Sequence, residues 1–382
     1  MDGDTKCEVL VVGAGPAGAA LAYNLAGQGF STILIDRKSR IDDPVRCAEY
    51  VPAGITGIGG FPVQGIQLAT ESMTTYIDFR EAKTIKAPGF MLDRKVFTSR
   101  LAGACRERGG IILKSTKAVS FKEEGDSIRT LVVGQGKERC ITSRIVVGAD
   151  GPLSAVGRYI GASNNSFILG LNENIPAEAE EKKRTMVFFS PWVPGGYGWL
   201  FPKQDSINLG IGCQRPADRV LEDLDLKGIY RAFKKMLFSI GFIKTPGPSG
   251  KIPEGRITAG LIPSAGMAGC TVKRGFVLAG DAAGLSNPVT GAGIYNALLS
   301  ADIAARRIGE ALKKSDISLL GRIGEDYRET FAASLNRAAA KRDEMLSRWP
   351  EGTGSRDDFA RMVRETWVSF RPYWERRSPD GG

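Results

Sequence analysis

The chain of 382 residues contains no histidine. This absence excludes a Ser-His-Asp triad, histidine-ligated metals and any imidazole acid or base. Proton transfer must therefore use a cysteine, tyrosine, lysine, carboxylate or water. The six cysteines are widely scattered and form no Cys-x-x-Cys pair, so the sequence predicts neither a metal site nor a disulfide framework. Reduced cysteines favour a cytoplasmic location.

Long hydrophobic runs are also absent. No apolar stretch reaches the ~18 residues of a membrane-spanning helix, and the acidic start Met1-Asp2-Gly3-Asp4 does not suit a signal peptide. The formal net charge is +10. This basic balance fits a solvated surface, peripheral contact with an anionic membrane surface, or an anionic substrate. We expect no nucleic-acid partner, because the sequence contains no nucleic-acid-binding module.

A β-α-β pattern opens the chain. Residues 8–12 are an apolar run that predicts a buried parallel strand, and Gly13-Ala14-Gly15-Pro16-Ala17-Gly18 follows it. A helix is expected over 19–26, and a second strand over 31–35 ends in Asp36, 21 residues after the middle glycine. In such a loop the first glycine permits a tight turn, the second lets backbone approach a pyrophosphate, and the third lets helix pack on strand. The acid can accept hydrogen bonds from a ribose.

Two later strand ends extend this site. Residues 145–149 predict a strand that ends in Asp150-Gly151, and residues 275–279 predict another that ends in Gly280-Asp281. A Gly-Asp pair near the C-terminus suits the ribityl and phosphate part of a long cofactor. A helix starting near Gly291 would aim its N-terminal dipole at a flavin ring. The sequence therefore predicts FAD rather than NAD as the bound cofactor. Because only one complete glycine motif is present, NAD(P)H or a reduced carrier such as ferredoxin would be a transient electron donor.

The remaining segments are interleaved with these pieces. Alternating apolar residues over 66–86 predict a strand and hairpin. The fold class is α/β, with a Rossmann-type FAD-binding domain, an inserted antiparallel-sheet substrate domain and a helical C-terminal region. The further strands are expected over 166–171, 184–189, 198–202 and 207–212, and the helical pattern over 293–348, with a break over 349–354 and a last helix over 356–370. The expected boundaries are 1–62, 93–164 and 270–312 for the FAD-binding domain, 63–92 and 165–269 for the substrate domain, and 313–382 for the C-terminal region.

Taken together, the strand ends resemble those of FAD enzymes built like para-hydroxybenzoate hydroxylase, over nearly the whole chain. Asp93-Arg94, before an expected helix over 95–108, is similar to an Asp-Arg element of that group. The resemblance implies that Arg94 lies near the FAD and that Asp281 binds its ribityl chain. One departure is Gly284, which stands where many members have histidine.

A second resemblance is narrower. Tyr197-Gly198-Trp199-Leu200-Phe201-Pro202, with Gly210-Ile211-Gly212 nearby, resembles a motif of the geranylgeranyl reductase family that lines an isoprenoid cavity. Alternate residues of a strand share one face, so the three aromatic side chains could wall an apolar chain. A plain aromatic stripe in the core is the alternative. The motif only partly resembles the Trp-x-Trp-x-Ile-Pro element of halogenases.

The segment Arg46-Cys47-Ala48-Glu49-Tyr50 is similar to a Cys-Gly-Glu element of geranylgeranyl reductases, with Ala48 in place of the glycine. The resemblance implies that Cys47 lies close to the isoalloxazine. We expect the neighbouring Arg46 to lower the pKa of the Cys47 thiol; the alternative is that this cysteine is a small buried hydrophobe. The proton donor is left open among Cys47, Glu49, Tyr50, Tyr197 and water.

Candidate residues follow from these patterns and resemblances. The catalytic candidates are Cys47, Tyr197 and Trp199. The cofactor-binding candidates are Gly13, Gly15, Ala17, Gly18, Asp36, Arg37, Arg46, Cys47, Ala48, Arg94, Val119, Asp150, Gly151, Gly280, Asp281, Gly291, Gly293 and Ile294. The substrate-pocket candidates are Tyr197, Trp199, Phe201, Pro202 and Pro288.

Three functions remain open at this point. The first is an FAD-dependent oxidoreductase that reduces C=C bonds of a polyprenyl lipid or quinone side chain. The second is an FAD-dependent monooxygenase, hydroxylase or halogenase acting on an aromatic compound or a peptide side chain, because fold does not determine function. The third is a non-enzymatic flavin or lipid carrier. Residues 362–377 mix aromatics with arginines, which suits an interfacial anchor or a terminal helix packed on the body.

Overall fold

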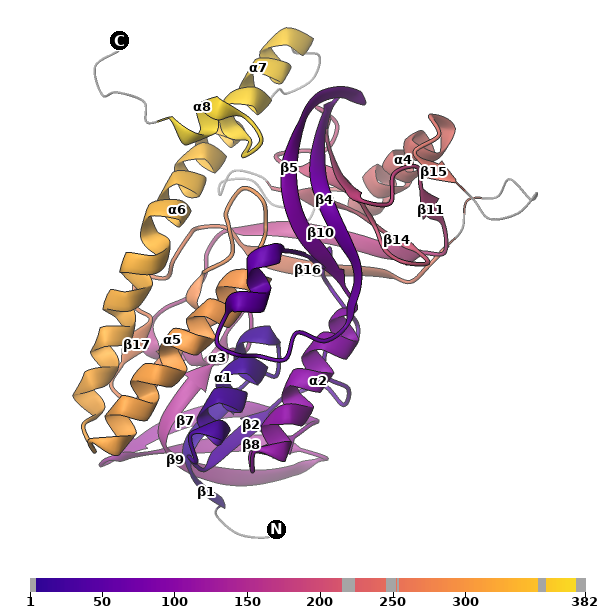
Figure 1. Ribbon diagram of the computed structural model, residues 1–382. Helices are drawn as coiled ribbons and strands as arrows, with labels where there is room; N and C mark the ends of the chain where they lie inside the picture. Colours follow the sequence, from indigo (N-terminus) through magenta and orange to yellow (C-terminus); the bar gives the residue numbers. More distant parts are fainter. Residues whose placement is uncertain (1–4, 215–223, 245–251, 253, 350–354, 376–382) are drawn as a thin grey trace, which may run out of the picture.

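The computed structural model describes residues 5–214, 224–244, 252, 254–349 and 355–375. Two sheets, one above the other in Figure 1, make up its framework, and the helices of the C-terminal part run along one side of both. The predicted break over 349–354 lies outside the described residues from 350 onward.

The lower sheet, here called the cofactor sheet, is formed by pieces from the N-terminal, central and C-terminal parts of the chain. Strands β1, β2, β6, β9 and β18 run parallel, as buried apolar runs such as Val9–Val11 predict. The strand order is β17 (Val272–Lys273), β18 (Phe276–Leu278), β9 (Lys137–Gly148), β1 (Thr5–Val12), β2 (Thr32–Ile35) and β6 (Ile111–Leu113). The antiparallel strands β7 (Thr116–Glu124) and β8 (Ser127–Gly134) extend β9.

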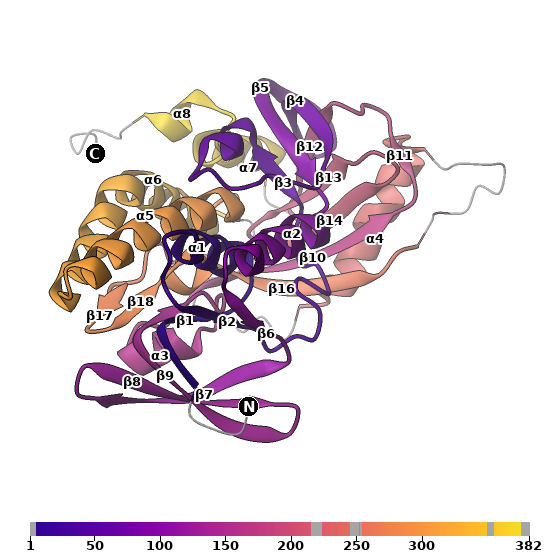
Figure 2. The same cartoon turned by 60° about the horizontal axis from the view of Figure 1, so that its bottom comes forward.

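Helices cover this sheet. Helix α1 packs between α2 and α5, and the expected apolar stripe from Ala297 to Ile308 on α5 is buried. Figure 2 shows these helices side by side with α6 (Gly321–Ser347). The bounds are α1 (Pro16–Gly27), α2 (Arg94–Glu107), α3 (Ala155–Ile160) and α5 (Ile294–Lys313). The predicted β-α-β unit and the helix after Asp93 are therefore confirmed.

The upper sheet, here called the substrate sheet, has the order β16 (Ile257–Pro263), β10 (Phe167–Ile175), β14 (Ile207–Cys213), β13 (Tyr197–Pro202), β12 (Arg184–Phe189), β4 (Ile66–Ile77), β5 (Arg80–Leu92) and β3 (Tyr50–Pro52). The sheet is antiparallel as expected except at one pairing, where β12 and β4 run parallel with Val187 opposite Thr75. Only strands joined by short turns must run antiparallel. These two strands come from distant segments, so no turn constrains their direction.

The substrate sheet has two different faces. Helix α4 (Leu226–Ser239) covers one of them, and Leu200 and Leu209 pack there against Phe233. We call this side the α4 face; the short strands β11 (Glu178–Ala179) and β15 (Ile243–Lys244) adjoin it. Side chains alternate along a strand, so Trp199 and Asn208 lie on the opposite side. We call that opposite side the site face.

The C-terminal part consists of α6 (Gly321–Ser347), α7 (Arg356–Thr366) and α8 (Arg371–Trp374). The helical pattern expected over 293–348 is divided after Lys313, and the last helix ends at Thr366 rather than at residue 370. Trp367 and Tyr373 are buried against the substrate sheet, whereas Trp374 is 55% exposed. Most aromatic side chains of this tail therefore pack on the body of the protein.

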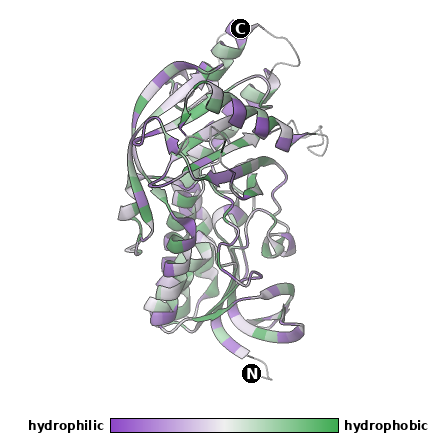
Figure 3. Ribbon diagram, turned by 90° about the vertical axis from the view of Figure 1, so that its right-hand side faces the viewer, coloured by the Kyte–Doolittle hydropathy of each residue, from purple (hydrophilic) through white to green (hydrophobic). Residues whose placement is uncertain are grey.

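Hydrophobic and hydrophilic residues are mixed along most elements (Figure 3). Among the helices of the described residues, none is both long enough and apolar enough to span a bilayer.

Candidate flavin site

The glycine-rich loop between β1 and α1 has the geometry that its three glycines require. Gly13 adopts a φ of 101°, and a side chain there would collide with the carbonyl of Ala149. A side chain at Gly18 would collide with the carbonyl of Gly13. At Gly15, by contrast, no protein atom lies within 4 Å of the position that a Cβ would take. The protein's own packing needs the outer glycines, while the middle one borders open space that fits a phosphate.

Two helices begin at glycines that offer no side-chain cap. The N-caps of α1 and α5 are Gly15 and Gly293, and neither helix end receives a side-chain hydrogen bond. Helices α2, α3 and α4 are capped instead by the side chains of Asp93, Ser154 and Asp225. The free N–H groups at an uncapped helix start favour an anion. Both helix starts expected to face FAD thus remain available to it.

Asp36 lies beside the glycine loop. Because β1 and β2 are parallel, with Val12 opposite Ile35, the end of β2 meets the end of β1. One carboxylate oxygen of Asp36 accepts from the N–H of Ala14 at 2.8 Å, and the other accepts from the N–H of Lys38 at 2.8 Å. The acid predicted for the ribose is therefore held at the mouth of the loop.

The other two strand-end acids are brought together by the pairing of β9 with β18. Gly148 lies opposite Leu278, so the loops that carry Asp150 and Asp281 leave the same edge of the sheet. Burial raises the pKa of both carboxyl groups. Asp281 accepts from the Ser286 hydroxyl at 2.6 Å. Three distant segments thus line one edge, which fits a cofactor as long as FAD.

Arg94, at the start of α2, is buried among these loops. Its guanidinium donates to Asp42 at 2.7 Å, and Thr98 donates to the same oxygen at 2.6 Å. The positive charge of Arg94 also lowers the pKa of Asp281, against the rise that burial causes. The residue implied by resemblance therefore lies between the N-terminal and C-terminal parts of the site.

The prediction for the Cys47 thiol is wrong in direction. Burial raises its pKa, and the cation that opposes this rise is Arg94 rather than Arg46. The Arg46 side chain is exposed, and its stem lies over Gly260 of β16. Sequence adjacency suggested Arg46, but the loop turns its side chain away from the thiol. Cys47 is therefore a protonated thiol near neutral pH.

Glu49 is the centre of a buried polar network that the sequence did not reveal. It is 2% exposed and adopts a φ of 65°, which is uncommon for a residue with a side chain. The carboxylate accepts from Lys203 Nζ at 2.7 Å, from the Arg94 N–H at 3.0 Å, and from the amides of Asn174 and Asn208 at 3.1 and 3.2 Å. We call these five residues the Glu49 network. The network joins the loop between β2 and β3, here called the Cys47 loop (residues 36–49), to the substrate sheet.

The aromatic residues of β13 share the site face, as predicted. Tyr197 donates to the carbonyl of Thr290 at 2.6 Å, and Trp199 donates to Asn208 at 2.8 Å. A side chain at Gly210 would collide with the Trp199 indole, which explains the nearby Gly-x-Gly. The ring centroids of Tyr197 and Trp367 are 4.9 Å apart. The aromatic stripe therefore lies between the flavin loops and the C-terminal helices.

The other predicted residues lie in different surroundings. Gly151, Gly280 and Gly291 have positive φ in the strand-end loops. Val119 is 51% exposed at an irregularity of β7, and Pro202 alternates to the α4 face rather than joining the three aromatics. Ala17 and Ile294 are buried at helix starts, whereas Arg37 is exposed after β2. Ala48 is half-buried beside Cys47, and the carbonyl of Pro288 accepts a hydrogen bond from Gln214. Their roles as ligands stay predictions.

Comparison with known proteins agrees with this geometry. The family described as FAD binding domain matches residues 6–48. The chain is 34% identical to digeranylgeranylglycerophospholipid reductase 2 of Methanosphaera stadtmanae over 82% of this chain and 80% of the relative. It is 30% identical to digeranylgeranylglycerophospholipid reductase of Methanocella arvoryzae over 87% of this chain and 86% of the relative.

Solved structures share the fold. A geranylgeranyl bacteriochlorophyll reductase-like protein from Thermoplasma acidophilum has a TM-score of 0.76 and 22% identity, covering 96% of this chain and 97% of the other. The flavin-dependent halogenase CmlS has a TM-score of 0.71 and 18% identity, covering 94% of this chain and 67% of the other. These likenesses show the fold alone, which reductases and halogenases share.

The fold and the three-part cofactor site define an FAD-dependent oxidoreductase. Among such enzymes, the chain belongs to the digeranylgeranylglycerophospholipid reductase family.

Proposed function

We propose that this enzyme reduces C=C bonds in the geranylgeranyl-type chains of a glycerophospholipid. The observation that carries the proposal is the site face of the substrate sheet, where the aromatic row of β13 adjoins the Cys47 loop through Asn208. Reduced FAD is the group that supplies the hydride for such a reaction. The names of the relatives supply the substrate class.

The chain's own residues have two tasks in this reaction. Tyr197, Trp199 and Phe201 provide apolar surface that excludes water from an isoprenoid chain. We assign the proton to Cys47, whose thiol stays protonated near neutral pH because burial raises its pKa, and whose loop is hydrogen-bonded through Asn208 to the aromatic row. The Glu49 carboxylate is engaged by four donors, and the Tyr197 hydroxyl points at a carbonyl oxygen. Both are less suited than Cys47 to deliver a proton.

The surface charge supports a lipid with an anionic head group. The net charge of +10 favours contact with phospholipid head groups, at a membrane surface or on a single molecule. A quinone with a polyprenyl side chain is a second substrate to test. For a monooxygenase we find no favouring observation beyond the shared fold.

The test is anaerobic. The FAD-loaded enzyme is reduced, and digeranylgeranylglycerophospholipid, menaquinone or an aromatic compound is added while the flavin absorbance is followed. We expect the prenyl lipid alone to reoxidise the flavin and to gain two hydrogens per reduced bond by mass spectrometry. Reoxidation only by oxygen would contradict the proposal.

A variant separates the role of Cys47. Cys47→Ala should slow reoxidation by the lipid at least tenfold, because one proton-transfer group contributes roughly 10²–10⁴-fold to a rate. Cys140→Ala, which changes a half-buried thiol on β9 away from the site, is the matched control. An unchanged rate for Cys47→Ala removes Cys47 from the proton transfer.

A further inference from the structure

Asn208 connects the aromatic row of β13 with the Cys47 loop. It lies on β14 opposite Phe201 and is 0% exposed. Its side-chain oxygen accepts from the Trp199 indole at 2.8 Å. Its side-chain nitrogen donates to the Cys47 carbonyl at 3.0 Å and to the Glu49 carboxylate at 3.2 Å. One buried amide therefore contacts the substrate row on one side and the loop on the other.

These contacts determine which way the Asn208 amide points. A reversed amide would place its NH₂ group against the indole N–H of Trp199, donor against donor. It would also place its oxygen against the Cys47 carbonyl and the Glu49 carboxylate, acceptor against acceptors. Because unpaired polar groups are unfavourable in a protein interior, the amide is held in one orientation.

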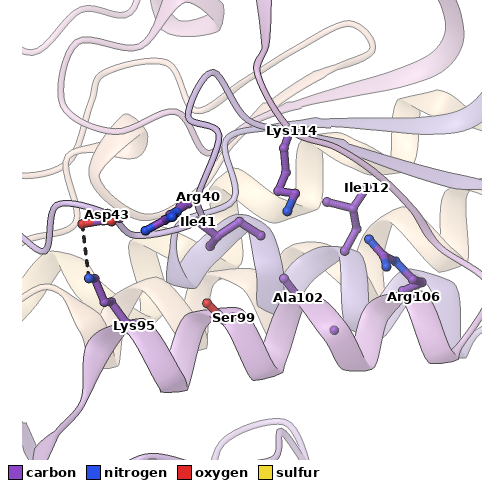
Figure 4. Close-up of a pocket in the computed structure, with 10 residues that line it drawn as sticks. Arg40, Ile41, Asp43, Lys95, Ser99, Ala102, Arg106, Ile112 and Lys114 are labelled. Carbon is purple, nitrogen blue, oxygen red and sulfur yellow. Dashed lines mark ion pairs between the residues drawn. The ribbon is translucent and has the colours of Figure 1, made fainter.

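The first half of the Cys47 loop is held by α2. Asp42 accepts from the Arg94 guanidinium at 2.7 Å. Asp43 pairs with Lys95 at 3.3 Å, at the edge of a cavity of about 510 Å³ between the loop and α2 (Figure 4). Arg94 and Lys95 are the first two residues of α2. These two ion pairs hold residues 42 and 43 and leave the position of the thiol to the second half of the loop.

The second half of the loop is held by the substrate sheet. Thr258 of β16 donates to the Val45 carbonyl at 2.7 Å, and Asn208 donates to the carbonyl of Cys47 itself. The thiol sulfur accepts from the N–H of Glu49 at 3.2 Å. Asn208 thus contacts both residues that direct the sulfur, the cysteine through its carbonyl and the glutamate through its carboxylate.

We propose that Asn208 is a positioning residue, which holds the Cys47 thiol in place beside the isoprenoid chain that lies on Trp199. The proposal rests on the proposed function, in which Cys47 gives the proton. A displacement of about 1 Å can lower a rate about 100-fold, so a proton donor carried by a loop needs a fixed link to the surface that binds the substrate. Asn208 acts through Cys47 and Trp199 rather than on the reacting atoms.

Two variants separate the two sides of this link. Anaerobic reoxidation of chemically reduced FAD by the prenyl lipid gives a maximal rate and a half-saturating lipid concentration. Asn208→Leu removes all three hydrogen bonds, so it should lower the maximal rate at least tenfold and raise the half-saturating concentration. Asn208→Asp keeps the acceptor for the Trp199 indole but loses both donations to the loop. It should lower the maximal rate as much, with the half-saturating concentration within twofold of wild type.

Asn174 provides a matched control. Its amide donates to the same oxygen of Glu49 at 3.1 Å, so Asn174→Ala removes one contact of this carboxylate and leaves those of Cys47 and Trp199 in place. We expect its maximal rate to stay within threefold of wild type. Equal losses in Asn174→Ala and Asn208→Leu would overturn the proposal, because the effect would then come from the Glu49 carboxylate alone. A wild-type maximal rate in Asn208→Asp would overturn it as well.

Alkylation of Cys47 tests the positioning without any lipid. Iodoacetamide should label Cys47 at least fivefold faster in both Asn208 variants than in wild type or Asn174→Ala, because a loop freed from the sheet exposes its thiol more often. Cys140, a half-buried thiol on β9, should react at one rate in all four proteins. An unchanged rate for Cys47, or an equal rise for Cys140, would overturn the proposal. A wild-type enzyme that the lipid fails to reoxidise would contradict the proposed function, and the labelling would still decide the role of Asn208.

Discussion

The two faces of the substrate sheet each bury a glutamate–lysine pair, and the pairs differ in what they connect. On the α4 face, Glu173 of β10 pairs with Lys234 of α4 at 2.9 Å and also accepts from Tyr230. On the site face, Lys203 at the end of β13 pairs at 2.7 Å with Glu49, which belongs to the Cys47 loop. Both glutamates are 2% exposed.

Because of this difference, we assign the Glu173 pair to stability alone and the Glu49 pair to both stability and flavin binding. The Glu173 pair joins a helix to the sheet that it covers, within one domain. The Glu49 pair joins the sheet to a loop of the cofactor site, and its glutamate adopts an uncommon backbone conformation. Such strain persists where the surrounding contacts impose it, and it is frequent at functional sites. We therefore expect the two pairs to contribute alike to folding and unlike to flavin binding.

The largest expected effect comes from removing one lysine at a time. Lys203→Met and Lys234→Met each leave a buried carboxylate without its cation, which costs about 3–5 kcal/mol of unfolding free energy. Urea unfolding should show a similar loss of unfolding free energy for the two variants. FAD titration should show a raised Kd for Lys203→Met alone. Equal FAD affinity in the two variants would remove the distinction between the faces.

A smaller loss of stability is expected when a glycine on each face of the substrate sheet is replaced by alanine. Gly198→Ala places a methyl group against Phe233 on the α4 face, and Gly210→Ala places one against Trp199 on the site face. Overpacking of this kind costs about 1–3 kcal/mol. Only Gly210→Ala should raise the KM for the prenyl lipid, because Trp199 belongs to the proposed substrate surface and Phe233 does not. A matching rise for Gly198→Ala would mean that substrate affinity reports stability alone.

The smallest effect concerns pH. Because burial raises the pKa of the Cys47 thiol, little thiolate exists near pH 8, and alkylation by iodoacetamide should be slower than for a free thiol of pKa ~8.5. The raised pKa adds stability below pH ~8.5, which is lost as the pH rises from there through the folded pKa. Peptide mapping after timed alkylation measures the Cys47 rate. A rate at pH 7 above that of a free thiol would indicate the activated thiolate expected from Arg46.

Local patterns explain which parts could be predicted. The glycine loop, the acids at strand ends and the shared face of Tyr197, Trp199 and Phe201 follow from spacing within one or two elements. The link between Glu49 and Lys203 spans 154 positions, so no local period reveals it. The parallel pairing of β12 with β4 is similarly non-local. Only the folded chain shows which of two arginines, Arg46 or Arg94, reaches Cys47.

The central claim is that one FAD lies along the glycine loop and the strand ends beside the site face. Titration of FAD into wild type and Gly15→Val tests it most directly. The Cβ of a side chain at this position would have no protein atom within 4 Å beyond its chain neighbours, so we expect the fold to persist while the side chain enters the space expected for the pyrophosphate. We predict one tightly bound FAD for wild type and at least 100-fold weaker binding for Gly15→Val, with unchanged circular dichroism. A wild-type protein that stays colourless in excess FAD, or a Gly15→Val variant that binds FAD equally well, would contradict the account.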